Sequence, residues 1–304
     1  MPSNDRSFTL TVGPVLTYWP RRTLVQFYAQ VAESAAGTVV LGEVVCSRRH
    51  EMKPDDWLAL ARDLSSAGKE VVLATQALLE SEADLRALRR IAAQGEFLVE
   101  AGDASALHVL VQAGVPHVLG PHINVYSHAA LQEHARLGAV RWVAPVELPL
   151  ASLARVNPPG GPITTEAWAF GRLPLSFSAR CFTARHHRLA KDQCDFRCLE
   201  DPDGLLLSTD DGQPFLALNG IQTLSAGQQC LIRERAALQA AGVSRLRLSP
   251  VSQGFGDVVA SFDRVMNQGA DAEDALAALR ALALPGGLVD GYAHQRPGLE
   301  WSAA

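Results

Sequence analysis

Four cysteines are the residues of this sequence whose type and spacing point most clearly to chemistry. Cys46 stands alone, whereas Cys181, Cys194 and Cys198 fall within one short segment. Thiolates are soft ligands, and four of them suit either a tetrahedral zinc ion or a four-iron cubane cluster. The residue types alone leave both metals open.

The alternative to metal binding is a set of unrelated buried cysteines, because a free cysteine often packs as a small apolar residue. Polar and charged neighbours of Cys194 and Cys198 argue against that interpretation: Asp192, Gln193, Asp195, Arg197, Glu200 and Asp201. Cys230 differs, since Leu231 and Ile232 follow it at the start of a predicted helix, and we assign it to packing. The sequence therefore predicts metal binding at the cluster, although its spacing is not that of a standard zinc or ferredoxin motif.

Basic residues lie close to these cysteines in the sequence. They form two groups, Arg48, Arg49 and His50 after Cys46, and Arg180, Arg185, His186, His187 and Arg188 around Cys181. Positive groups would offset the charge of a thiolate-ligated cluster or bind an acidic substrate. The alternative is a solvated loop, which we favour for His186 and His187.

Eight short apolar runs alternate with helical patterns along the chain. The predicted strands are Phe8–Val12, Thr38–Val45, Glu70–Ala74, Glu96–Val99, Val118–Val125, Val140–Ala144, Thr165–Phe170 and Arg245–Leu248. The predicted helices are Thr23–Ala35, Pro54–Ala67, Ser81–Gln94, Ala104–Ala113, Ser127–Leu137, Leu148–Val156, Gln228–Ala241 and Asp257–Asn267. This alternation predicts an α/β fold, a TIM-type (β/α)8 barrel forming one domain over residues 1–304, with an open doubly wound sheet as the rival.

A long insertion after the seventh predicted strand, residues 171–227, carries the cysteine cluster. Its runs Leu205–Leu207 and Phe215–Leu218, separated by turn residues, predict a β-hairpin. Long loops inside a compact domain are usually functional. In a barrel this insertion and Cys46, at the end of the second predicted strand, open on the same face, so the four thiols are expected to converge there.

Other polar residues stand at predicted strand ends of the same face: Gln76, Glu100, Asp103, His122, Asn124 and Glu147. Any of them would line a pocket there, although each alone is more often a helix cap or a surface group. The sequence contains no nucleophile–base pair of diagnostic spacing, no glycine-rich phosphate loop and no His-Glu-x-x-His helix. The catalytic residues therefore remain unknown from sequence.

Composition excludes several classes of protein. The 304 residues are 48% hydrophobic and 19% charged, which is typical of a folded chain and not of disorder. A formal net charge of −5 argues against a general nucleic-acid binder. No apolar run approaches the ~20 residues of a membrane span, and residues 1–6 contain no apolar signal core, so we expect a cytoplasmic protein.

Three stretches resemble the collagenase-like peptidase family, in particular its members in ubiquinone biosynthesis. They are Glu43–Met52, Gly171–Cys181 and Cys194–Cys198, while His122–Tyr126 fits more loosely. The resemblance covers most of the chain and implies a TIM-type barrel core.

The same resemblance implies a [4Fe-4S] cluster held by Cys46, Cys181, Cys194 and Cys198, with Cys230 outside the set. It implies a heterodimer with a UbiU-like protein, acting in oxygen-independent hydroxylation of ubiquinone precursors under anaerobic conditions. A lipid-binding accessory protein belongs to that pathway.

One departure from the wider family bears on activity. Peptidase-type members carry a His-Gly pair before the cysteine motif, and here the stretch is Ala169-Phe170-Gly171-Arg172. The missing histidine disfavours proteolysis. Two alternatives to the iron–sulfur protein stay open, a structural zinc barrel that serves as an interaction module and, ranked last, a metal-independent peptidase.

Overall fold

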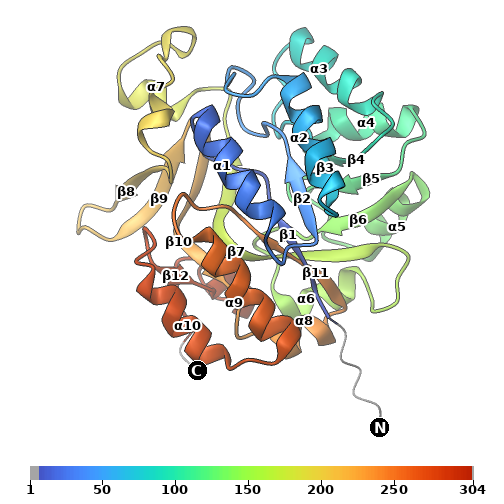
Figure 1. Ribbon diagram of the computed structural model, residues 1–304, viewed down its shortest axis with the longest axis vertical. Coiled ribbons are helices and arrows are strands. Elements are labelled where there is room, and N and C mark those ends of the chain that lie inside the picture. Colours follow the sequence, from blue (N-terminus) through green and yellow to red (C-terminus); the bar gives the residue numbers. More distant parts are fainter. Residues whose placement is uncertain (1–6, 303–304) are drawn as a thin grey trace.

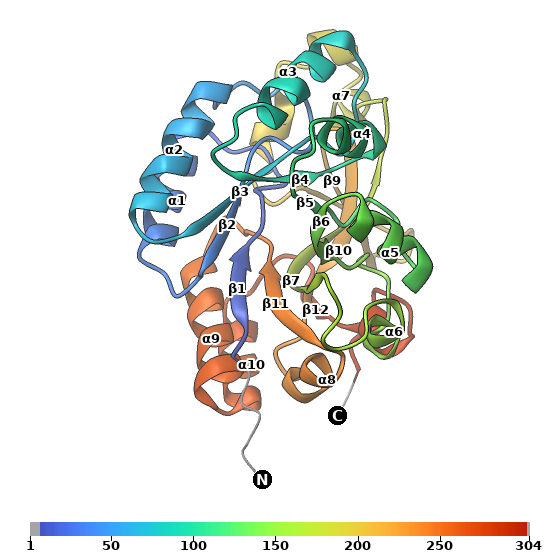
Figure 2. The ribbon, with the colours of Figure 1, turned by 90° about the vertical axis from the view of Figure 1, so that its right-hand side faces the viewer.

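The computed structural model describes residues 7–302, and its centre is a closed barrel of eight parallel strands (Figures 1 and 2). The barrel strands are β1 (Thr9–Val12), β2 (Thr38–Leu41), β3 (Glu70–Ala74), β4 (Leu98–Ala101), β5 (His117–Leu119), β6 (Ala139–Val143), β7 (Thr164–Phe177) and β11 (Val243–Leu248). Strand β11 pairs in parallel with both β1 and β7, and this pairing closes the sheet. The predicted TIM-type barrel is confirmed, and the open sheet is wrong.

Helices surround the barrel (Figures 1 and 2). They are α1 (Arg21–Ala32), α2 (Pro54–Ser66), α3 (Glu82–Ala92), α4 (Ala104–Gln112), α5 (His128–Arg136), α6 (Leu150–Val156), α8 (Arg235–Ala240), α9 (Phe255–Gln268) and α10 (Ala272–Ala281). Ser81 caps α3 as expected, its hydroxyl accepting a hydrogen bond from the backbone N–H of Asp84. Helix α10 is not among the predicted elements. No helix in residues 7–302 is both long and apolar enough to cross a bilayer.

Strand β7 is far longer than predicted, because it leaves the barrel at Gly171 and continues among antiparallel strands that extend the same sheet. Gly171 has φ +104°, and a Cβ there would lie 2.5 Å from the Cβ of Ser249, so only glycine fits this crossing. Beyond it, β7 pairs antiparallel with β10 (Gln222–Cys230). We call the second half of β7, together with β10, β9 (Pro214–Asn219) and β8 (Leu205–Ser208), the β-arm.

Several boundaries differ from the sequence prediction; for example, the fifth predicted strand ends at Leu119 and not at Val125. The hairpin is present as β8 and β9, but the stretch before Cys230 is strand β10 and not the start of a helix, because it hydrogen-bonds to β7. The two-residue strand β12 (Leu288–Val289) pairs with its end. Strand β2 ends at Leu41, since the carboxylate of Glu43 accepts the backbone N–H groups of Val45 and Cys46 and turns the chain.

An apolar plug fills the barrel near the carboxyl ends of its strands. Its members include Val40, Val72, Val118, Val143 and Trp168. Cys46 and Cys181 pack against this plug from the loop side. The plug therefore forms the floor of the face on which the cysteines were predicted to meet.

Candidate metal centre

The four cysteines of the predicted ligand set lie in loops beyond the carboxyl ends of the barrel strands. Cys46 is in the loop between β2 and α2, and Cys181 caps α7 (Phe182–His186). Cys194 follows the short turn η1 (Lys191–Gln193), and Cys198 lies in η2 (Arg197–Glu200). Both views show α7 and α3 at the end of the molecule opposite α9 and α10 (Figures 1 and 2).

Three of these thiols lie near enough to influence one another electrostatically. Burial, with a smaller contribution from the charge of Cys181, raises the pKa of Cys46 and raises that of Cys198 to about 11. In residues 7–302, however, no three His, Cys, Asp or Glu side chains converge as ligands of one metal ion would. A four-iron cluster places each thiolate on a different iron, so its ligands are spread farther apart than those of a zinc ion. The donor types suit either a zinc ion or an iron–sulfur cluster.

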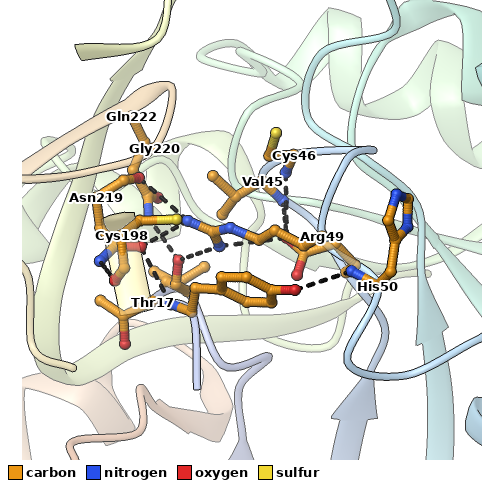
Figure 3. Close-up of polar contacts among 12 residues, drawn as sticks. Thr17, Val45, Cys46, Arg49, His50, Cys198, Asn219, Gly220 and Gln222 are labelled. Carbon is orange, nitrogen blue, oxygen red and sulfur yellow. Dashed lines mark hydrogen bonds and ion pairs between the residues drawn. The ribbon is translucent and has the colours of Figure 1, made fainter. Parts of the chain in front are cut away.

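Arg49 links the Cys46 loop to the Cys198 segment (Figure 3). Its side chain is 1% exposed and forms an ion pair of 3.3 Å with Glu43. Its Nη1 donates to the carbonyl of Leu16 at 3.2 Å, and its Nη2 donates to Oδ1 of Asn219 at 2.6 Å. Its positive charge lies close enough to the thiol of Cys198 to lower the pKa of that thiol, against the larger effect of burial. This geometry fixes a positive charge beside a candidate ligand, where it would favour the thiolate form.

Asn219 is a positioning residue that the sequence analysis missed. Its Nδ2 donates to the carbonyls of Cys198 and Asp201, both at 2.9 Å, and its Oδ1 accepts the backbone N–H of Tyr18 at 3.1 Å. The sequence does contain an indication of this turn, because the Asn219-Gly220 pair lies between two strand-like runs and Asn-Gly pairs are typical of hairpins. The hairpin of β9 and β10 places this amide beneath the Cys198 turn.

Gly220 follows Asn219, and its backbone approaches Arg49 closely. It has φ +72°, and a Cβ there would lie 2.8 Å from Nη2 of Arg49, a group that several hydrogen bonds hold in place. We expect Gly220→Ala to lower the free energy of unfolding by the strain of a left-handed alanine, about 1–2 kcal/mol, and by about 1 kcal/mol more for disturbed Arg49 contacts.

The matched control for this prediction is Gly212→Ala. Gly212 has φ +84° but open space at its Cβ position, so only the strain should be lost. Urea unfolding of both variants measures the difference. Equal losses at the two glycines would contradict the close approach to Arg49.

The segment from Cys181 to Cys198 is held by specific contacts and carries unusual backbone. Nη2 of Arg48 donates to the carbonyl of Asp192 at 2.8 Å, which joins the Cys46 loop to the segment that carries Cys194. Three non-glycine residues here adopt left-handed conformations, with φ values of 57°, 49° and 52°: Arg188, Asp195 and Phe196. Such conformations cost energy and cluster at functional sites.

Some of the basic residues near the cysteines lie at the site, as charge compensation requires, and others are exposed, as in a solvated loop. Arg49 is buried at the site, whereas Arg180, Arg185 and Arg188 are exposed. His186 is also exposed, and its ring contacts that of His187 at 5.1 Å between centroids. The solvated-loop interpretation therefore holds for the exposed members.

The other polar residues at predicted strand ends have separate roles. Asp103 caps α4 by accepting the backbone N–H of Ala106 at 2.9 Å, and Glu147 accepts a hydrogen bond from the hydroxyl of Tyr126. Burial and the charge of Arg247 lower the pKa of His122 to about 4, so this ring is neutral at pH 7. Asn124, another of these polar residues, adopts a left-handed backbone conformation. Gln76 lines a cleft between α2 and α3.

Glu100 points into the barrel lumen and belongs to an ion network that sequence analysis did not anticipate. Nη1 and Nη2 of Arg247 donate to its two carboxylate oxygens at 2.9 and 2.5 Å, and Nε donates to Glu166 at 2.6 Å. The network continues toward the amino ends of the strands through Arg141, Glu70 and Arg245. Arg245 and Arg247 are two residues apart in the predicted strand, so the sequence already indicates that both arginines lie on the same face of it.

The chain is similar to one known protein family and to several solved structures. Residues 23–302 match Peptidase family U32. A solved U32 peptidase, Mk0906, shares 11% identity over 81% of this chain and 94% of its own, with a TM-score of 0.45. Phospho-2-dehydro-3-deoxyheptonate aldolase of Thermotoga maritima shares 11% identity over 87% of this chain and 70% of its own, with a TM-score of 0.45. Dihydropteroate synthase of Stenotrophomonas maltophilia shares 13% identity over 91% and 93%, with a TM-score of 0.41. Because the family match spans nearly all of the sequence, the chain belongs to peptidase family U32.

Proposed function

We propose that this chain is a cytoplasmic iron–sulfur subunit of an oxygen-independent hydroxylation system in ubiquinone biosynthesis, a counterpart of UbiV. The observation that supports it is the grouping of Cys46, Cys181 and Cys198 from distant parts of the sequence, with the buried Arg49 beside Cys46 and Cys198. A UbiU-like protein would be its heterodimeric partner, and a lipid-binding protein of the same pathway would act with them.

In this proposal the chain's residues hold and shield the cofactor. Cys46, Cys181, Cys194 and Cys198 would ligate a [4Fe-4S] cluster, which supplies one-electron chemistry when bound. Arg49 would balance the negative charge of the thiolates from a fixed position. The apolar plug below Cys46 and Cys181 would keep water from reaching the cluster through the lumen.

Peptidase activity is the rival within the family. The histidine of the peptidase-type motif is replaced by Phe170, a fully buried core residue. A buried phenylalanine can neither transfer a proton nor attack a peptide bond. We therefore expect no hydrolysis of casein or gelatin by the metal-loaded chain or by its complex.

Single replacements of the four cysteines by alanine test the ligand assignment. We expect each variant, purified without oxygen, to lose most of its iron and its broad visible absorbance, because a cubane needs its four thiolates. Cys230→Ala is the control, since Cys230 is 2% exposed in the main core and lies outside the set. Unchanged iron in Cys194→Ala or Cys198→Ala, or the same loss in a folded Cys230→Ala, would overturn the assignment.

The partner and pathway require a second experiment. Co-expression with a UbiU-like protein should give a stable one-to-one species, and cells lacking the chain should stop making ubiquinone only without oxygen. A chain that remains monomeric at micromolar concentration, or a normal anaerobic ubiquinone content, would contradict the proposal. The four cysteine variants should fail to restore ubiquinone in the same cells.

A further inference from the structure

The outer edge of the β-arm is a strand without the usual protection. In residues 7–302, β8 pairs with β9 alone and forms the end of the sheet, and Figure 1 shows this hairpin at the left-hand edge of the molecule. Its residues Leu205, Leu206 and Leu207 include no charge and no proline, two devices that keep edge strands from pairing with other chains. The one irregularity in its pairing lies at the far end, between Leu207 and Ser208. The edge therefore offers backbone N–H and C=O groups to a further strand.

Contacts between the start of β8 and the barrel loops hold this edge in place. The carbonyl of Pro202 accepts hydrogen bonds from Oγ1 of Thr17 and Nε1 of Trp19, both at 2.6 Å. The carboxylate of Asp203 accepts hydrogen bonds from the backbone N–H and the hydroxyl of Ser252, at 2.8 and 2.5 Å. A strand that is fixed before binding loses little conformational entropy when a partner docks. The edge is thus preorganised for the addition of a strand from another chain.

The surface around this edge is apolar at its centre and acidic at its ends. Leu206 is 38% exposed, and Phe215 on the neighbouring strand β9 is 50% exposed. Acidic residues flank β8 on both sides, Asp201 and Asp203 before it and Asp210 and Asp211 after it. If two copies of the chain paired antiparallel through β8, the acidic residues before the strand in one copy would face those after it in the other. Opposed like charges destabilise strand pairs, so the edge fits a different chain, whose apolar strand has Lys or Arg at its ends.

We propose that β8 is the docking edge for the second subunit of the complex, which adds an apolar strand with basic residues at its ends. That this subunit is the UbiU-like protein rests on the proposed function, whereas the docking edge rests on the geometry and charge of the β-arm. The β-arm also carries Asn219, which holds the Cys198 turn. Docking at β8 would therefore place the second subunit on the strands that support the candidate metal centre.

Calorimetric titration of the full chain, purified without oxygen, with the UbiU-like protein tests the inference. We expect Leu206→Lys to weaken association at least tenfold, because its ammonium group would lose water within the strand pair, and Phe215→Lys to act in the same direction. Val140→Lys is the matched control, since Val140 is 41% exposed on barrel strand β6, outside the β-arm, and its dissociation constant should equal that of the wild type. All three positions are exposed, and urea unfolding checks that the variants remain folded.

The acidic ends are tested separately by Asp210→Lys. Complementary charge acts mainly on the association rate, so this variant should associate more slowly and with a weaker dependence on salt. Asp63→Lys is its control, because Asp63 is exposed on α2 and should not change the association rate.

Three outcomes would overturn the inference in distinguishable ways. Unchanged association of both Leu206→Lys and Phe215→Lys would remove the docking edge and leave the proposed complex intact. A homodimer of the chain alone that Leu206→Lys dissociates would assign the edge to a second copy instead. If the wild-type chain formed no complex, both the docking edge and the proposed partner would be wrong, and the iron content would still test the proposed cofactor.

Discussion

Replacing Arg247 with methionine should lower the free energy of unfolding by about 3–5 kcal/mol. Arg247 is 1% exposed in the barrel lumen and neutralises the carboxylates of Glu100 and Glu166, which are themselves buried. Methionine keeps much of the side-chain volume but leaves two negative charges in the lumen without this partner. The expected loss is a large share of the 5–15 kcal/mol that stabilises a typical domain.

Urea unfolding of the metal-loaded protein measures this loss, and Arg62→Met is its control. Arg62 also pairs with a glutamate, Glu96, but the two side chains are 59% and 41% exposed. Exposed ion pairs contribute about 0–1 kcal/mol, so the control should stay near the wild type. A loss at Arg247 no larger than at Arg62 would show that the lumen network does not form.

Replacing Asn219 with alanine should release the candidate cluster as well as destabilise the fold. The carbonyl of Cys198 and the backbone N–H of Tyr18 would lose their partners in a buried site, at a cost of about 2–4 kcal/mol. Changes to groups that support metal ligands reduce metal affinity about 10- to 100-fold. Iron transfer to a chelator, followed without oxygen, should therefore be faster by a similar factor.

Asn267→Ala separates a general loss of stability from an effect on the site. The Asn267 side chain bonds the backbone N–H and carbonyl of Phe8 at 2.7 and 3.1 Å, at the amino end of β1. Its replacement should destabilise the fold without hastening iron release. If both asparagine variants lost iron at the same rate, Asn219 would have no specific role in holding the Cys198 turn.

The barrel was predictable because its signal is local and repeated. Apolar runs, helix spacing and caps such as Ser81 each follow from a few neighbouring residues, and their eight repeats favour a closed barrel over an open doubly wound sheet. Strand β10 was not predictable in the same way. Its residues before Cys230 are polar and small, and only pairing with the distant β7 makes them a strand.

Part of the candidate site could likewise be predicted from local sequence, and part depends on contacts between distant segments. Cys46, Cys181, Cys194 and Cys198 were identifiable from residue type and from resemblance to a family. Arg49 was noted only as one of several nearby charges, and its burial against Asn219 follows from the β-arm folding over the Cys46 loop. The lumen network likewise depends on strands that are far apart in sequence.

We infer that this chain carries a cubane cluster on its cysteine face. The most direct test is the measurement of iron, acid-labile sulfide and zinc in the protein purified without any exposure to oxygen. We expect about four iron and four sulfide per chain and no stoichiometric zinc, as a [4Fe-4S] cluster requires. One zinc per chain in a colourless protein, or no metal at all, would contradict it.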